Sequence, residues 1–272
     1  MKKALIAAAV AAACAAPAIA QQAAPAPEHT FTANVGIVSD YLFRGISQTK
    51  GEPAIQGGFD YAHSSGLYAG TWLSNVSWYN DANPGASKSL EFDLYGGYKG
   101  SFGSSDFGYD LGLIRYSYPG THPDGSVSPN TTEVYGAVSW KFLALKYSHV
   151  ISENFVAWGT SNGVAKSRNS HYLELNANYD LGDGWGLLGH VGHQKVADYD
   201  NAGQPGSVTA DGVASYTDWN IGVSKDVGFG VVAVKYSDTN AKTHCGATPQ
   251  AYCWGGYEAG KGRGVISFSK TF

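Results

Sequence analysis

The chain has 272 residues and a formal net charge of -4, and it contains 36 glycines, 18 tyrosines and 7 tryptophans but a single methionine. This composition favours strands, turns and aromatic surfaces over helices. A mean hydropathy of -0.19 excludes a bundle of membrane-spanning helices, and the lack of a Lys/Arg cluster argues against a nucleic-acid partner.

Residues 1–20 have the features of a secretory signal peptide. A basic start precedes an apolar stretch over 4–16, and Ala18 and Ala20 fit the small-x-small pattern of a cleavage site. We therefore expect export of a mature chain that begins at Gln21.

Cys14 leaves a second interpretation of this segment open, which is lipidation at a lipoprotein cleavage site. The three alanines before it lack the larger aliphatic residue that such a site usually has three positions upstream. Residues 21–30 are rich in Ala and Pro, which is typical of extended, unpacked chain. We expect them to form a flexible periplasmic arm before a folded region at 31–272.

From residue 31 onward the recurring pattern is a period of two, which is typical of strands with one apolar and one polar face. In "GVISFSKTF", Ile266 and Phe268 alternate with Val265 and Ser267. About twelve such strands are predicted, because the pattern repeats around centres near Val38, Phe59, Thr71, Tyr95, Leu113, Tyr135, Leu145, Leu175, Val191, Ile221, Val234 and Phe268.

The stretch "SDYLFRGISQT" places two charges inside an apolar run near the start of the folded region. Alternation assigns Tyr41 and Phe43 to the apolar face of the first strand. The charges of Asp40 and Arg44 then belong to the opposite, polar face. The prediction is a strand that keeps both charges away from its apolar surroundings.

Connection lengths help to distinguish a membrane barrel from a soluble sandwich. The links after the even-numbered strands are tight ("HSSG", "GSSD", "SWKF", "GDGW" and "DVGF"), whereas most links after the odd-numbered strands are long, with Gly45 to Glu52 the shortest. Bacterial outer-membrane barrels have this asymmetry, with short periplasmic turns and longer outer loops. The sequence therefore predicts an all-β fold, a transmembrane antiparallel up-and-down β-barrel with long extracellular loops and both termini on the short-turn side.

Aromatic residues gather toward the predicted strand ends, where an outer-membrane barrel has its interfacial girdles. A soluble two-sheet sandwich buries its apolar faces and needs no aromatic excess outside, but turn-flanking aromatics that pack a soluble core stay open as an alternative. The residues assigned to the girdles are Tyr41, Phe43, Trp72, Trp78, Tyr98, Tyr116, Tyr118, Trp140, Tyr147, Tyr179, Trp185, Trp219 and Tyr236.

The runs "SDYLFRGISQT", "PAIQGGFDYAHSSGLYAGTWLSNVSW", "LEFDLYGGYKG" and "ISFSKTF" together resemble the TorF porin family of Gram-negative bacteria, over essentially the whole of residues 31–272. The resemblance implies an outer-membrane β-barrel that acts as a diffusion pore, without naming a solute. Phe268 and Phe272 are similar to the C-terminal signal read by the barrel-assembly machinery. Lys270 departs from that signal because it falls on the same face.

The inner surface of the predicted barrel is narrow. Twelve tilted strands close at a backbone radius of roughly 12 Å, so a folded-in loop would close the lumen, whereas inward small residues such as Gly36, Gly70 and Ala233 favour an open channel. Charges on the polar faces either set a transverse field for small polar or charged solutes or merely pair off and solvate the wall. The pore-lining candidates are Asp40, Arg44, Asp60, Glu91, Asp93, Lys99, Arg115, Glu133, Lys146, Glu174 and Lys235.

Cys245 and Cys253 are the only cysteines that follow the signal peptide, and both lie in the last long loop. An oxidising compartment favours a disulfide between them. A metal site that includes His244 would lack two further ligands. His190 and His193 in "HVGH" point to opposite faces of a strand, so they do not form a metal pair.

The loop at 197–215 gathers Asp198, Asp200 and Asn201. Calcium binding stays open there, although solvated turn residues explain the same composition. No cofactor and no resident metal is predicted for the chain.

Two other functions remain open beside a channel. A plugged structural or adhesive barrel would use its outer loops and fill its lumen. A barrel lipid hydrolase needs a Ser–His pair at the rim, and His149 lies suitably on an apolar face, but no serine motif accompanies it. We therefore predict no enzyme, with outer-membrane lipid, the assembly machinery and small solutes as partners and an unknown oligomeric state.

Overall fold

A computed structural model of the chain describes residues 27–159, 166–197, 210–247 and 250–272. The predicted signal peptide at 1–20 and most of the predicted arm at 21–30 lie outside the described residues. The same holds for the aspartates and the asparagine of the candidate calcium loop.

The barrel strands form one closed antiparallel sheet, in which each strand pairs with its neighbours along the chain. The first strand closes the barrel, because it pairs with the second on one side and with the last on the other. The strands are β1 (His29–Val38), β4 (Ala54–His63), β5 (Leu67–Asn75), β6 (Leu90–Ser101), β7 (Phe107–Ser117), β8 (Thr131–Trp140), β9 (Leu143–Val150), β10 (His171–Gly182), β11 (Trp185–Lys195), β12 (Tyr216–Asp226), β13 (Val231–Thr239) and β16 (Arg263–Thr271).

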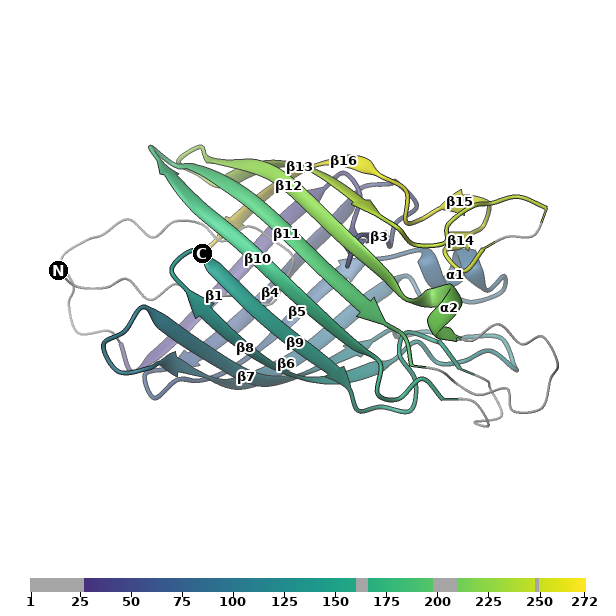
Figure 1. Ribbon diagram of the computed structural model, residues 1–272, viewed down its shortest axis with the longest axis horizontal. Helices are drawn as coiled ribbons and strands as arrows, with labels where there is room; N and C mark the ends of the chain where they lie inside the picture. Colours follow the sequence, from purple (N-terminus) through teal and green to yellow (C-terminus); the bar gives the residue numbers. More distant parts are fainter. Residues whose placement is uncertain (1–26, 160–165, 198–209, 248–249) are drawn as a thin grey trace.

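This architecture confirms the predicted up-and-down barrel of twelve strands. Tight turns join the strands at one end, on the left in Figure 1, and long loops leave the other end. Phe272 exchanges two backbone hydrogen bonds with Ala33, at 2.8 and 3.2 Å, so the end of the last strand lies beside the first strand.

The remaining elements are short and belong to the long loops. They are the hairpin β2 (Leu42–Phe43) and β3 (Ile46–Ser47), the hairpin β14 (Cys253–Trp254) and β15 (Tyr257–Glu258), and the helices α1 (Trp78–Ala82) and α2 (Ala210–Ala214). Within the described ranges, no helix is long and apolar enough to cross a membrane.

The two faces of the wall have opposite character. Ile37, Leu145 and Val191 point outward and stay about half exposed, whereas Glu91 and Ser148 point inward and are buried. An apolar exterior around a polar interior is the arrangement that a barrel needs in lipid, where its backbone groups bond between strands. Part of the predicted girdle is confirmed, because the exposed outer aromatics include Tyr98, Trp140, Tyr147, Tyr179, Trp185, Trp219 and Tyr236.

The prediction for the first strand is wrong beyond its middle. β1 ends at Val38, and Tyr41 and Phe43 leave the wall with the following loop instead of facing lipid. Tyr41 is 6% exposed and packs against Trp72 inside the barrel, with ring centroids 5.2 Å apart. The apolar–polar alternation of the sequence continues past Val38, although the chain leaves the sheet there.

Four other aromatics assigned to the girdle also pack inside rather than on the lipid face. Trp72 and Tyr116 lie on the inward faces of their strands, and Trp78 and Tyr118 lie in the loops that follow. All four are at most 8% exposed and belong to one buried cluster with Tyr41. Their position near strand ends was predicted, but their face was not.

Tyrosine rings cover glycines on the inner wall. A Cβ added to Gly70 would lie 2.6 Å from the Tyr95 ring, and one added to Gly192 would collide with the Tyr172 ring. The expectation that inward glycines such as Gly70 widen the lumen is therefore wrong at this position. The glycine instead makes room for a large side chain from the neighbouring strand.

Replacing Gly112 with alanine is expected to destabilise the barrel. The added Cβ would lie within 2.5 Å of Tyr135 Cζ and 2.8 Å of the Gly96 carbonyl oxygen. Overpacking of this kind costs about 1–3 kcal/mol, which urea unfolding followed by tryptophan fluorescence will measure. Gly264→Ala is the matched control, because nothing lies within 4 Å of its added Cβ. Equal unfolding midpoints for the two variants would contradict the packing argument.

Candidate functional site

The first long loop, residues 39–53, folds into the barrel instead of away from it. Its hairpin turns at Arg44 and Gly45, whose φ angles are 50° and 78°. Glycine suits the second position because left-handed backbone is open to it. A Cβ there would also collide with side chains of Asp218 on β12 and Thr239 on β13, at 2.7 and 2.6 Å. The tip of the hairpin therefore packs closely against the inner wall.

The side chain of Arg44 connects the tip of the hairpin to the inner wall. Its Nη2 donates to Glu133 Oε2 on β8 at 2.7 Å, and its Nη1 donates to Gln194 Oε1 on β11 at 2.6 Å. Its guanidinium also lies 4.4 Å from the centre of the Tyr172 ring on β10. One loop side chain thus joins three strands of the wall, and the hairpin forms a constriction inside the barrel.

The Arg44–Glu133 ion pair is shielded from solvent. The Arg44 side chain is 8% exposed and the Glu133 side chain is wholly buried. Burial acts to lower the pKa of the guanidinium, but the charge and hydrogen bond of Glu133 together with the nearby Tyr116 and Tyr172 outweigh burial, so the pKa is raised. A buried ion pair contributes little net stability, yet removing one partner leaves the other as a buried charge without compensation. The pair therefore makes the position of the hairpin sensitive to either charge.

The base of the hairpin is held by Asp40. Its Oδ1 accepts hydrogen bonds from the Ser47 and Thr49 hydroxyls at 2.6 and 3.0 Å. Its Oδ2 pairs with Arg263 Nη1 at 2.9 Å, and the Ser47 backbone N–H donates to the Ala259 carbonyl at 2.9 Å. The first loop is thereby fixed to the last loop and to the start of β16.

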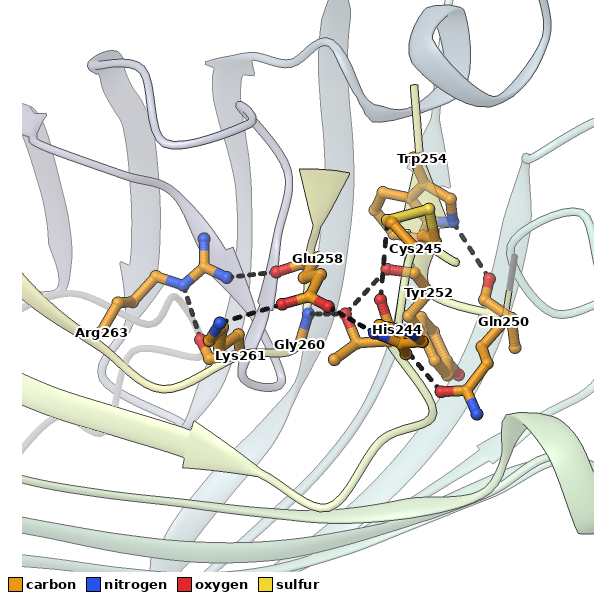
Figure 2. The surroundings of a disulfide bond; sticks show 12 residues. His244, Cys245, Gln250, Tyr252, Trp254, Glu258, Gly260, Lys261 and Arg263 are labelled. Atoms are coloured by element: carbon orange, nitrogen blue, oxygen red, sulfur yellow. Dashed lines mark hydrogen bonds and ion pairs between the residues drawn. A yellow bond between two sulfur atoms is a disulfide. The ribbon is translucent and has the colours of Figure 1, made fainter. Parts of the chain in front are cut away.

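The last long loop is itself cross-linked. Cys245 and Cys253 form the predicted disulfide, which Figure 2 shows beside His244. His244 contacts Glu258 Oε1 at 3.1 Å, and Lys261 contacts Oε2 at 3.1 Å. Hydrogen bonds from Lys261 and then from His244 lower the pKa of Glu258. In this structure His244 is thus placed with a carboxylate of the same loop.

Arg263 joins this cross-linked loop to the hairpin. Besides Asp40, its guanidinium donates to the Glu258 and Ala259 carbonyls at 2.7 and 3.1 Å, and to the Tyr257 hydroxyl. Figure 2 shows the arginine pointing toward Glu258. Arg263 was absent from the predicted site, and its only sequence signal was a single charge at the start of the last strand.

The structure places most of the pore-lining candidates on the inner side of the barrel. Asp40 and Arg44 belong to the inserted loop and not to a wall strand. The candidates on inward strand faces are Asp60, Glu91, Asp93, Lys99, Glu133, Lys146, Glu174 and Lys235.

Arg115 is a correction to that set. It shares its face with Leu111 and Leu113, which are exposed on the outside, and it donates to Thr132 Oγ1 at 2.8 Å. The inward positions of the same strand hold Ile114 and Tyr116, whose side chains pack in one cluster with Tyr41 and Phe43 of the inserted loop. Polarity was a poor guide to the face of β7, since the lumen beside it is apolar.

Acidic and basic groups on the inner wall partly pair. Lys146 Nζ lies 4.0 Å from Glu174 Oε1, and His190 Nε2 lies 3.0 Å from Asp218 Oδ2. The Tyr172 hydroxyl also donates to Asp218 Oδ1 at 2.8 Å. His190 and Asp218 were missed as lumen residues, although each alternates with an apolar neighbour along its strand.

The comparisons with known proteins give a family and a fold. A family model described as "Bacterial protein of unknown function (Gcw_chp)" matches residues 22–272. The chain belongs to this Gcw_chp family. The matching family model is not the TorF porin family, which the sequence motifs resemble. No curated protein matches the chain.

Solved structures similar to this Gcw_chp barrel include bacterial outer-membrane proteins. A NanC porin structure matches with a TM-score of 0.50 at 10% identity, covering 89% of this chain and 99% of that chain. OprD of Pseudomonas aeruginosa matches with a TM-score of 0.42 at 12% identity, covering 89% and 66%. This chain therefore spans about two thirds of the OprD length. At 10% identity, the likeness to the NanC porin shows the barrel fold alone.

Proposed function

We propose that the protein is an outer-membrane porin-like channel for passive diffusion of small polar or charged solutes, with the Arg44 hairpin as its constriction. The observation that carries the proposal is the inserted loop, which is tied to the wall of a closed barrel by the Arg44–Glu133 ion pair. A loop fixed by a few polar contacts narrows a lumen and sets which solutes pass.

Three further features support this function. The wall is apolar outside and polar inside, the sequence motifs resemble TorF porins, and structures with the same fold include a NanC porin. Under this proposal, Phe268 and Phe272 at the end of β16 serve as the signal for barrel assembly, and outer-membrane lipid surrounds the exposed apolar face.

A plugged structural barrel is the second candidate function. The burial of the Arg44–Glu133 pair and the tyrosine rings over Gly70 and Gly192 favour it, because both reduce free space inside. The hydrolase alternative depends on His149, whose ring contacts Tyr147 on the outer face at 3.3 Å, and phospholipid release by purified protein is its assay.

Planar-bilayer recording of detergent-refolded full-length protein tests the channel. We expect discrete conductance steps smaller than those of sixteen-stranded porins, because twelve strands enclose a narrower lumen. A liposome-swelling panel with neutral solutes of increasing size gives the cut-off. Silence across repeated insertions of folded protein would favour the plugged barrel instead.

A further inference from the structure

Two inward carboxylates of β6 are buried, and in the described part of the chain neither has an ion-pair partner. Glu91 is wholly buried and Asp93 is 4% exposed, and the two lie two residues apart on one face of the strand. Neither Glu91 oxygen accepts a hydrogen bond of standard geometry, nor does Asp93 Oδ1. Glu133, on β8, is within electrostatic range of Asp93. Three carboxyl groups are therefore gathered beside the constriction.

Three cations of the inner wall and the loops already have other partners. Arg44 bonds to Glu133, and Lys146 approaches Glu174. Lys88 donates to the carbonyls of Tyr118 and Gly120 at 2.6 and 2.9 Å. Within the described ranges, no ion pair of Glu91 or Asp93 is seen.

Oxygen atoms and aromatic faces complete the surroundings of the pair. The hydroxyls of Tyr118 and Tyr41 lie beside the Glu91 carboxyl group. Tyr41 comes from the inserted loop and packs against Trp72, whose strand neighbours β6. Carboxylate and hydroxyl oxygens are ligands of hard cations, and aromatic faces attract positive charge.

A carboxylate that is buried without a counter-charge costs several kcal/mol, so such a group gains a partner or loses its charge. We propose that Glu91 and Asp93 form a binding site for small cations at the constriction, which makes the channel select cations over anions. This inference rests on the proposed channel function. The pair acts as an acidic ring does in other cation channels, by raising the local cation concentration.

The reversal potential across a KCl gradient tests the selectivity. Wild-type protein is expected to favour K⁺ over Cl⁻, and the double variant Glu91→Gln with Asp93→Asn is expected to lower that permeability ratio about fivefold. The amides keep the shape of the side chains, so the barrel is expected to fold. Glu174→Gln is the matched control, because this inward carboxylate has Lys146 beside it, and it is expected to change the ratio much less.

A second measurement does not require conduction. At equal ionic strength, wild-type protein is expected to unfold at a higher temperature in KCl than in N-methylglucamine chloride, and the double variant is expected to lose that difference. A conducting wild type that prefers anions, or an unchanged ratio in the double variant, would overturn the cation site. So would equal midpoints of the wild type in the two salts. A silent channel with the K⁺ effect intact would instead overturn the channel and leave the site.

Discussion

Replacing Arg44 with alanine is expected to open the barrel. The change leaves Glu133 wholly buried without its counter-charge for as long as the hairpin stays in the lumen. Breaking a buried ion pair in this way costs roughly 3–5 kcal/mol, so the hairpin is expected to leave the lumen and admit water to the carboxylate. An increase of about 100-fold in the open-to-closed ratio follows from the lower end of that range. Single-channel recording measures the ratio directly.

The double variant Arg44→Ala with Glu133→Gln tests the cause of that opening. It removes the uncompensated charge of Glu133, so the hairpin is expected to return to the lumen. The open-to-closed ratio is then expected to fall back toward the wild-type value. Arg168→Ala is the control for loss of an arginine from one of the long loops. Conductance of Arg44→Ala that equals the wild type would mean that the ion pair does not hold the hairpin.

The barrel was predictable because it follows from strand periodicity and loop lengths. Ile266 and Phe268 alternate with Val265 and Ser267 in the sequence, and the same residues alternate outward and inward in β16. Tight links such as "GDGW" leave no room for anything but a turn. These signals are local in the sequence. They predict the fold correctly here because every barrel strand is paired on both sides.

The constriction was not predictable in the same way, because it depends on contacts between distant residues. Arg44 was named as a lumen charge, yet its partners Glu133 and Gln194 are 89 and 150 residues away along the chain. Tyr41 and Phe43 continued the alternation of β1 although the chain had already left the wall. What sends the loop inward is the turn at Gly45 together with Asp40, which bonds within its own loop and to Arg263.

Arg115 shows why polarity alone misassigns a face. A polar residue on a barrel strand is normally inward, but the hairpin brings aromatic rings into the lumen beside β7. Ile114 and Tyr116 then take the inward positions, and the arginine lies on the outer face near the long-loop end, bonded to Thr132. The face of this strand follows from the inserted loop, and no residue within the strand indicates that loop.

Reduction of the Cys245–Cys253 disulfide is expected to loosen the constriction without unfolding the barrel. The bond closes a loop with a sequence separation of 8, and the chain-entropy model assigns such a constraint roughly 2.5 kcal/mol. The rest of the same long connection, just after Cys253, supplies the Ala259 carbonyl that binds Ser47 and the carbonyls that orient Arg263 toward Asp40. The barrel strands keep their own hydrogen bonds, so only the loops and the hairpin respond.

Two measurements follow from that coupling between the last loop and the hairpin. Reducing agent is expected to speed trypsin cleavage after Lys261, and to raise the open-to-closed ratio by less than Arg44→Ala does, because the Arg44–Glu133 pair persists. The double variant Cys245→Ser with Cys253→Ser is expected to behave like the reduced protein and to be insensitive to reducing agent. If cleavage accelerates while the open-to-closed ratio stays constant, the last loop moves independently of the hairpin. The contacts of Asp40 with Arg263 would then not transmit the constraint.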